Sequence, residues 1–209
     1  MKHTFRLRLL LLLALMAAGI ATVSAQNAAQ VLDKAVTKVR KASSVNCGFR
    51  IESKGSAALS GTFESSAGKF RLKTPAGTTW YDGRDMWTSN PRTKEITVVK
   101  PSDAEVSEVN PFAYLDSWKS KYVVGFSRRK DAARHLVVIN PKDRNSDIKA
   151  VEIAVNKKTY LPERFIIRDR NDNVSTVYIN TLTLTAKNAA SLFECPVGSM
   201  SDYEVVDLR

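Results

Sequence analysis

The spacing of apolar residues predicts a helix near the start of the chain. Between residues 31 and 42 apolar side chains recur every three or four positions, and the positions between them are mostly charged. This spacing gathers the apolar side chains on one face of an amphipathic helix, with Asn27 as its expected cap. The apolar face comprises Val31, Leu32, Ala35, Val36, Val39 and Ala42.

After Ser44 the apolar spacing changes to two, which is the period of a β-strand. Short alternating segments, separated by turn-forming residues, predict a meander of about ten to eleven antiparallel strands. The expected strands occupy residues 48–54, 58–65, 68–73, 77–82, 85–90, 94–100, 122–128, 134–140, 148–156, 160–169 and 173–185.

Two local patterns lie between these strands. In the run from Trp80 to Trp87, the pair Asp82-Gly83 predicts a hairpin with a tight type I′ turn. Residues 102–120 lack the alternation and predict two short helices, the first capped by Ser102 and the second following Asn110-Pro111.

The alternation leaves one face of the sheet apolar. Apolar side chains share a face in the segment 151–155 and again at Phe165 and Ile167, with Glu163 as a polar exception. Because so large a sheet exposes more apolar area than a few helices cover, we expect it to curve around them. The expected fold is mainly β (α+β), an unclosed antiparallel half-barrel with an N-terminal helix and a short-helix lid over its concave apolar face. Two states of the hollow fit the pattern, one filled by the protein's own side chains and one partly empty.

The first 25 residues have the features of an export signal. Three basic residues precede an apolar core from Leu9 to Ala21, which is too short to span a membrane, and Val23-Ser24-Ala25 fits the pattern of a cleavage site. Since Gln26 rather than a cysteine follows, we expect an exported protein that is not itself lipid-anchored. The mature part, residues 26–209, is expected to be soluble and to form one domain.

Composition adds a positive charge. The formal net charge is +11, and loss of the export signal, which holds three basic residues and no acidic one, lowers it to +8. Export argues against nucleic acid as a partner. The charge therefore belongs to a solvated surface, or it serves contact with anionic membranes and acidic proteins. The basic stretch Arg128-Arg129-Lys130 with Arg134 fits either use.

The two cysteines form an even pair in an exported chain. A disulfide between Cys47 and Cys195 would close a loop of about 150 residues and stabilise the fold by about 4 to 5 kcal/mol in the chain-entropy model. The alternative is two separate buried thiols.

Signals for catalysis are weak. His135 is the only histidine after the export signal, and it lies within an expected strand. Asp82 and Asp85 belong to the expected hairpin turn and its flank, where acidic residues are common. The sequence has no glycine-rich phosphate loop, and neither cysteine has a neighbour at metal-ligand spacing. We therefore expect no enzymatic activity, no cofactor and no metal site.

Several segments, taken in order, carry a family resemblance. The run from Asp82 to Pro91 reads D-G-x-x-M-W-x-x-N-P, and it follows Gly61-Thr62-Phe63 and Gly68-Lys69-Phe70-Arg71. Asn110 to Leu115 and Phe193 to Gly198 come later. Together these segments resemble the LolA family of periplasmic outer-membrane lipoprotein carriers, and the ending from Glu204 to Arg209 is similar to its Bacteroidetes branch.

The resemblance implies that an apolar hollow holds the acyl chains of a lipoprotein on its way from the inner to the outer membrane. It also implies a Gram-negative periplasm, an inner-membrane ABC-type release complex as donor and an outer-membrane acceptor. We expect a monomer that touches membrane surfaces transiently. One departure concerns the lid. Better-known members carry an arginine before a proline, and this arginine is their lid latch, but here the chain reads Ser65-Ser66-Ala67-Gly68. The latch mechanism is therefore not transferred to this chain.

Alternation and helical spacing nominate side chains that would line the hollow and bind acyl chains. For each of them the alternative is a place in an ordinary core. The candidates are Phe63, Phe70, Leu72, Trp87, Ile96, Val98, Phe112, Leu115, Trp118, Val151, Ile153, Phe165 and Ile167.

Two other functions fit the same pattern. An adaptor on this scaffold would bind lipid or a misplaced lipoprotein to signal envelope stress. A hydrolase acting on glycans or lipids would need a convergent pair of acids in the hollow.

Overall fold

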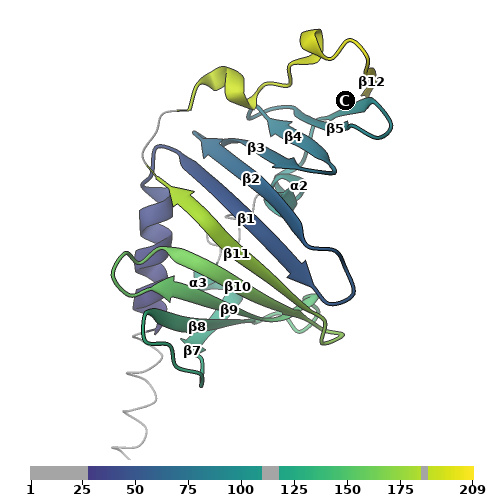
Figure 1. The fold of residues 1–209 in the computed structure, drawn as a ribbon. Coiled ribbons are helices and arrows are strands. Elements are labelled where there is room, and N and C mark those ends of the chain that lie inside the picture. Colours follow the sequence, from purple (N-terminus) through teal and green to yellow (C-terminus); the bar gives the residue numbers. More distant parts are fainter. Residues whose placement is uncertain (1–27, 110–117, 185–187) are drawn as a thin grey trace, which may run out of the picture.

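A single twelve-stranded sheet dominates the structure, a computed structural model that describes residues 28–109, 118–184 and 188–209 (Figure 1). The strand order is β12-β6-β5-β4-β3-β2-β1-β11-β10-β9-β8-β7, and within the described residues no ladder joins the two ends of this order. The expected export signal, the cap Asn27 and the lid residues Phe112 and Leu115 lie outside the described residues.

The strands confirm the predicted meander. The first run is β1 (Val45–Ser53), β2 (Leu59–Ser66), β3 (Lys69–Thr74), β4 (Gly77–Tyr81), β5 (Met86–Asn90) and β6 (Glu95–Val99). The second run is β7 (Tyr122–Phe126), β8 (Arg134–Pro141), β9 (Ile148–Asn156), β10 (Pro162–Asp169) and β11 (Val174–Thr183). Neighbours in each run pair antiparallel as hairpins, and the antiparallel pair β1 and β11 joins the two runs.

The predicted N-terminal helix and the capped helix after Ser102 are confirmed, whereas the helix predicted after Asn110-Pro111 lies mostly outside the described residues. Residues 28–40 are helical, and two short α-helices lie between the strand runs, α2 (Asp103–Val109) and α3 (Trp118–Lys121). Ser102 caps α2 as predicted: its backbone N–H donates to the Glu105 carboxylate at 2.8 Å, and the Glu105 N–H donates back to the Ser102 hydroxyl at 3.4 Å.

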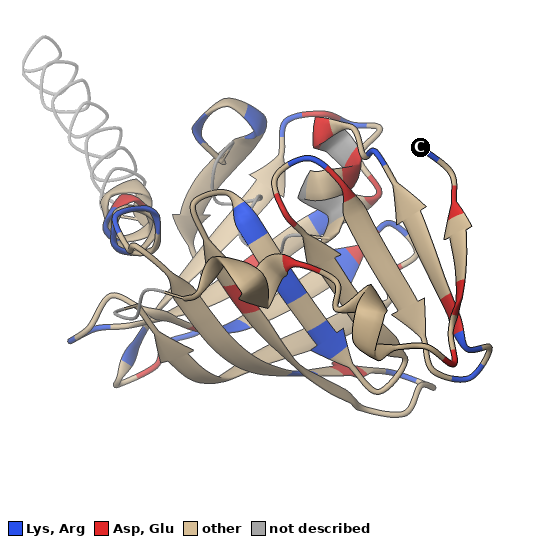
Figure 2. Cartoon of the chain, turned by 90° about the horizontal axis from the view of Figure 1, so that it is seen from above, with Lys and Arg blue, Asp and Glu red and all other residues tan. Residues whose placement is uncertain are grey.

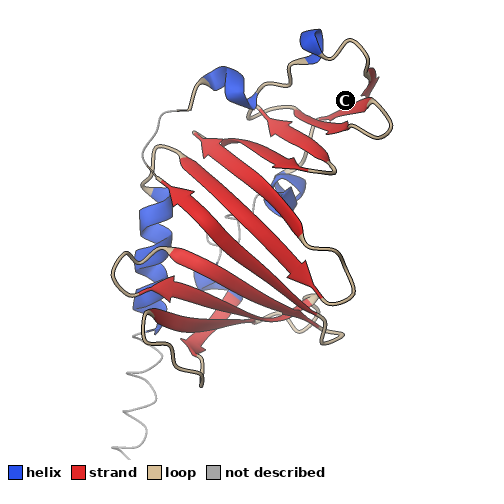
Figure 3. Cartoon of the chain, viewed as in Figure 1, coloured by secondary structure: helices blue, strands red, loops and turns tan. Residues whose placement is uncertain are grey.

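Helices and strands form two layers around the apolar interior. The N-terminal helix and α2 both pack on one face of the sheet, which we call the inner face (Figures 2 and 3). The sheet curves on this side, so the predicted unclosed half-barrel is confirmed. The opposite, outer face is covered in part by the C-terminal segment, which contains the 3₁₀ turns η2 (Ala190–Phe193) and η3 (Val197–Ser199).

One strand was not predicted. β12 (Glu204–Asp207) adds to the edge of the sheet beside β6, and it is parallel to β6 whereas every other pair is antiparallel. Four residues are too few to show a period, so only the long-range pairing reveals this strand.

The hairpin between β4 and β5 is confirmed, but its turn type is not. A type I′ turn needs two residues with positive φ, and only Gly83 has one here, at 97°. The Asp82 side chain organises the turn instead, because its Oδ1 accepts the backbone N–H groups of Arg84 and Asp85, each at 2.8 Å. Gly77 allows the close pairing of these strands: a Cβ there would lie 1.9 Å from the carbonyl oxygen of Ser89.

Candidate functional site

The inner face is defined by cross-strand register. Phe63 lies opposite both Cys47 and Leu72, and Phe70 lies opposite Tyr81. Directly opposed residues point to the same side of a sheet, so these side chains share one face. The aromatic rings confirm it, with ring centroids 5.7 Å apart for Phe63 and Phe70 and 5.4 Å apart for Phe70 and Tyr81.

Each end of the inner face is sealed by a helix. At one end the N-terminal helix packs on β8 and β9, where Val137, Ile153 and Val155 are at most 2% exposed. At the other end Val106 and Val109 of α2 pack against a cluster formed by Cys47, Phe49, Phe63 and Phe70. Both ends stabilise the fold, because each Å² of apolar surface removed from water contributes about 25 cal/mol.

Between these sealed ends the inner face carries apolar side chains that are only half-buried. They belong to β1, β10 and β11, the central strands of the sheet. Leu182 contacts the clusters at both ends, so the surface is continuous. We call this surface the middle strip: Ile51, Phe165, Ile167, Val177, Ile179 and Leu182.

Most of the predicted lining residues lie on the inner face. Leu72, Phe165 and Ile167 are half-buried there, whereas Phe63, Phe70, Val151 and Ile153 are buried in the sealed ends. Trp118 at the start of α3 is 6% exposed and packs in the cluster under the N-terminal helix. Phe112 and Leu115 lie outside the described residues.

Three predicted lining residues lie on the other side of the sheet. Trp87 is opposite Val98, and both are out of phase with the inner-face residue Met86. Ile96 lies two residues before Val98 and therefore shares its outer face. Apolar character alone did not separate the faces, because this part of the outer face is buried almost as deeply as the inner face. Ile96 is 0% and Val98 is 2% exposed.

Four residues of the middle strip were missed by the sequence prediction: Ile51, Val177, Ile179 and Leu182. Val177 and Ile179 follow the two-residue period and were available to it. Leu182 is out of phase with them because the β1–β11 ladder shifts register between Gly48 and Phe49. A single sequence does not show such a bulge, and it turns Leu182 inward.

The cysteines do not pair in the structure, where both are free thiols. Cys47 packs on the inner face with Phe49 and Phe63, whereas Cys195 follows η2, which contacts β3 and lies beside the outer-face residue Trp80. The sheet therefore separates the two side chains, and of the two alternatives the structure has separate thiols. Burial raises the pKa of Cys47 to about 12 and that of Cys195 to about 11, so neither is a thiolate at neutral pH.

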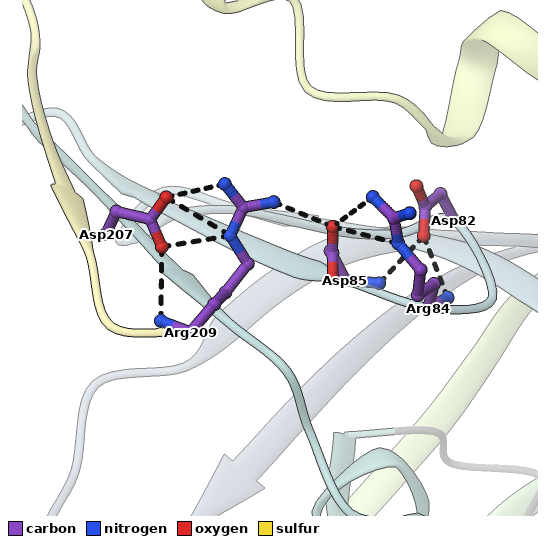
Figure 4. Close-up of polar contacts among 5 residues, drawn as sticks. All are labelled: Asp82, Arg84, Asp85, Asp207 and Arg209. Carbon is purple, nitrogen blue, oxygen red and sulfur yellow. Dashed lines mark hydrogen bonds and ion pairs between the residues drawn. The ribbon is translucent and has the colours of Figure 1, made fainter.

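Of the two acids at the β4–β5 turn, Asp82 binds the turn backbone and Asp85 holds the C-terminal segment. The Asp85 carboxylate is 3% exposed and accepts hydrogen bonds from Arg84 and from Arg209, at 2.8 and 2.9 Å (Figure 4). Arg209 also pairs with Asp207 at 2.5 Å. The Arg84 guanidinium, followed by Arg209, lowers the pKa of Asp85. These groups form a structural clamp, and we call them the C-terminal clamp: Arg84, Asp85, Asp207 and Arg209.

Other polar groups near the inner face are also engaged structurally. Glu163, the polar exception in β10, accepts hydrogen bonds from Arg134 at 2.6 Å and from Asn156 at 2.7 Å. His135 stacks between Phe126 and Tyr160, and burial lowers its pKa. Within the described residues no group of three or more His, Cys, Asp or Glu side chains is placed to hold a metal ion. No helix formed by the described residues is long and apolar enough to cross a membrane.

Known proteins are similar to this chain in sequence. The sequence profile of the family described as "Outer membrane lipoprotein carrier protein LolA" matches residues 19–171. The outer-membrane lipoprotein carrier protein of Shewanella pealeana is 24% identical over 160 residues, which cover 70% of this chain and 72% of that protein.

Two solved structures resemble the fold at low sequence identity. An uncharacterized conserved protein from Thermus thermophilus has a TM-score of 0.57 and 15% identity, covering 87% of this chain and 99% of that one. A putative outer membrane lipoprotein-sorting protein domain from Vibrio parahaemolyticus has a TM-score of 0.48 and 10% identity, covering 84% and 99%. The Thermus likeness shows a shared architecture.

Proposed function

The chain belongs to the LolA family of outer-membrane lipoprotein carrier proteins, and from this premise we propose that it carries lipoproteins by sheltering their acyl chains on the middle strip. Binding is reversible and involves no covalent chemistry. The family is not an enzyme family, and the two acids of the β4–β5 turn have structural partners: Asp82 organises the turn and Asp85 belongs to the C-terminal clamp.

One observation carries the proposal: a continuous apolar strip is only half-buried between two fully packed ends of the inner face. Ordinary cores bury such side chains completely, and a partly accessible apolar surface inside a curved sheet is typical of a binding surface. Phe165 and Ile167 lie on it beside the cluster under the N-terminal helix, and Ile51 and Val177 lie beside the cluster under α2.

The energetics explain why acyl chains need such a surface. Each methylene moved from lipid into water costs about 0.8 kcal/mol, so one chain of about 16 carbons costs on the order of 12 kcal/mol. A half-buried strip removes much of this cost without holding the chain as a closed core would. That balance suits a carrier, which must release its cargo.

We place the carrier in the periplasm as a monomer, between a donor and an acceptor. The export signal supports the location, and the family suggests an ABC-type release complex in the inner membrane and an acceptor at the outer membrane. The cargo class is lipoproteins with fatty acyl chains.

The binding test uses two isoleucines that are neighbours in β10 but face opposite sides of the sheet. Ile167 faces the middle strip, and the half-buried Ile166 lies on the outer face. The probe is a synthetic triacylated lipopeptide added to delipidated protein. We expect Ile167→Gln to weaken binding about tenfold, because it places an amide against acyl chains. Ile166→Gln is expected to leave the Kd unchanged. Equal effects of both variants, or no binding by the wild type, would contradict the proposed site.

The cellular test separates transport from sensing. Depletion of the protein, followed by membrane fractionation, is expected to leave lipoproteins stalled at the inner membrane. If the purified protein binds the lipopeptide but depletion leaves sorting unchanged, the carrier role is refuted in favour of the sensing adaptor.

A further inference from the structure

Basic side chains from three segments gather at one end of the half-barrel. The turn 127–133 lies beside the turn 157–161, because Lys157 Nζ donates to the carbonyl oxygens of Asp131 and Ala132 at 2.8 and 2.9 Å. The N-terminal helix adjoins the second turn through Lys38, whose Nζ donates to the Thr159 carbonyl at 2.6 Å. We call this region the basic end: Lys34, Lys38, Arg128, Arg129, Lys130, Arg134, Lys157 and Lys158.

Little of this charge is compensated. Arg134 pairs with Asp131 and Glu163, and Arg129 pairs with Glu152. The side chains of the remaining cations contact only neutral carbonyls or the ring and hydroxyl of Tyr160, or they have no partner within the described residues. Arg128, Lys130 and Lys158 belong to the last group, and all three are exposed on turns. The basic end therefore projects a positive potential into solvent.

An aromatic ladder lies within the basic end. The ring centroids of Phe126 and His135 are 6.2 Å apart, and those of His135 and Tyr160 are 6.0 Å apart. Lys34 Nζ sits 4.7 Å from the centroid of Tyr160, and Phe126 is 37% exposed. The positive charges of Lys157 and Lys34 add to burial in lowering the pKa of His135. An exposed aromatic ring such as Phe126, backed by half-buried rings among lysines and arginines, is typical of surfaces that meet lipid headgroups.

We propose that the basic end docks on an anionic phospholipid surface. The proposal rests on the proposed function, since it describes where the carrier meets the membrane. The middle strip reaches the same end of the half-barrel. β11 ends at Thr183, one residue after Leu182, and the antiparallel β10 begins at Pro162, directly after the turn 157–161. Docking there brings the strip close to the headgroups and shortens the exposed path of an acyl chain.

The same features favour lipid over an acidic protein surface. A site built for specific carboxylates holds its cations in fixed geometry, whereas the side chains of Arg128, Lys130 and Lys158 have no contact that fixes them within the described part of the chain. Long, free cations on separate turns suit a fluid surface on which anionic headgroups rearrange.

The test is co-sedimentation with vesicles at low salt, using the full exported protein. One set contains phosphatidylcholine alone, and the other contains equal parts of phosphatidylcholine and phosphatidylglycerol. The double variant Arg128→Glu/Lys130→Glu reverses two free cations of the basic end. The control Lys73→Glu/Lys100→Glu makes the same change in net charge at exposed lysines on β3 and after β6.

We expect the wild type to bind only the anionic vesicles, and salt of about 0.5 M to abolish binding. Arg128→Glu/Lys130→Glu should weaken the partition at least about twentyfold, since each cation near an anionic surface contributes about fivefold. In the control variant the logarithm of the partition should fall by less than a third of its fall in Arg128→Glu/Lys130→Glu. Equal losses in both variants would show a response to net charge alone and overturn the proposal.

Two further measurements separate this proposal from the proposed function. Arg128→Glu/Lys130→Glu should still bind the triacylated lipopeptide, and Ile167→Gln should still bind anionic vesicles. If the wild type binds lipopeptide but ignores anionic vesicles at low salt, the membrane-docking proposal fails while the carrier function stands. Binding of the basic end to an acidic protein would then be its remaining use.

Discussion

At the scale of single residues, strand phase decides which side chains belong to the candidate site. Met86 and Trp87 are neighbours in β5, yet Met86 packs on the inner face and Trp87 lies opposite Val98 on the outer face. Hydrophobicity does not distinguish them, since both faces of this part of the sheet are covered. The face of a residue follows from its cross-strand partner, which the sequence alone does not identify.

The first prediction concerns the two thiols. Denatured but unreduced protein should react with an alkylating reagent at both Cys47 and Cys195, because the structure holds them apart as free thiols. Native protein should react slowly at Cys47, which is 5% exposed and whose pKa is raised to about 12. Mass spectrometry counts the adducts. Denatured protein that takes up none would establish a disulfide and contradict the structure.

At the scale of elements, the N-terminal helix shows how the regular spacing of apolar residues leads to packing against the sheet. The side chains of Val31, Leu32, Ala35, Val36 and Val39 that the spacing places on one face are all buried against β8 and β9. Ala42 packs against the same cluster from just beyond the helix. The exposed face carries Lys34 and Lys38, which contribute to the basic end.

The second prediction tests this packing. Leu32 is 0% exposed, so Leu32→Ala should lower the free energy of unfolding by about 2 to 4 kcal/mol through lost burial and a cavity. Thr37→Ala, on the exposed face of the same helix, should change it by less than about 0.5 kcal/mol. Urea unfolding followed by circular dichroism measures both. A similar loss in the two variants would mean that the helix does not dock as described.

At the scale of the whole molecule, the C-terminus completes the outer face. β12 extends the sheet beside β6, η2 packs on β3, and Arg209 reaches the buried carboxylate of Asp85 in the β4–β5 turn. Residues far apart in sequence thus hold one edge of the half-barrel. The C-terminal clamp keeps this segment on the outer face, opposite the middle strip.

The third prediction follows from the pKa shifts in the clamp. Arg209 lowers the pKa of Asp207 from 3.8 to about 2, and Arg84 and Arg209 lower that of Asp85. A carboxylate whose pKa is lower in the folded state stabilises the fold above its unfolded pKa, and the contribution is lost as the pH falls towards the folded value. Asp207→Asn should therefore be less stable than the wild type at pH 6, and the difference should shrink as the pH falls from about 4 to about 2 and vanish below about 2.

The control for this prediction is Asp147→Asn, an exposed side chain with no bond to another described side chain. It should match the wild type across the same pH range. Urea midpoints measured at several pH values provide the comparison. A stability difference for Asp207→Asn that persists unchanged at pH 2 would show that the ion pairs are not its cause.

The sequence by itself determined the elements. Periods of 3.6 and two are properties of local backbone geometry, so the helix, eleven of the strands and the capped helix after Ser102 were readable from spacing. The same spacing predicted a curved sheet with one apolar face. The resemblance of the run from Asp82 to Pro91 pointed to the correct family.

Only the tertiary structure decided which apolar residues meet. Register put Trp87, Ile96 and Val98 outside, a bulge turned Leu182 inward, and pairing with β6 created β12. The tertiary structure also placed Cys47 and Cys195 on opposite sides of the sheet. Each of these outcomes depends on contacts between distant segments, and a local pattern holds no information about its partner strand.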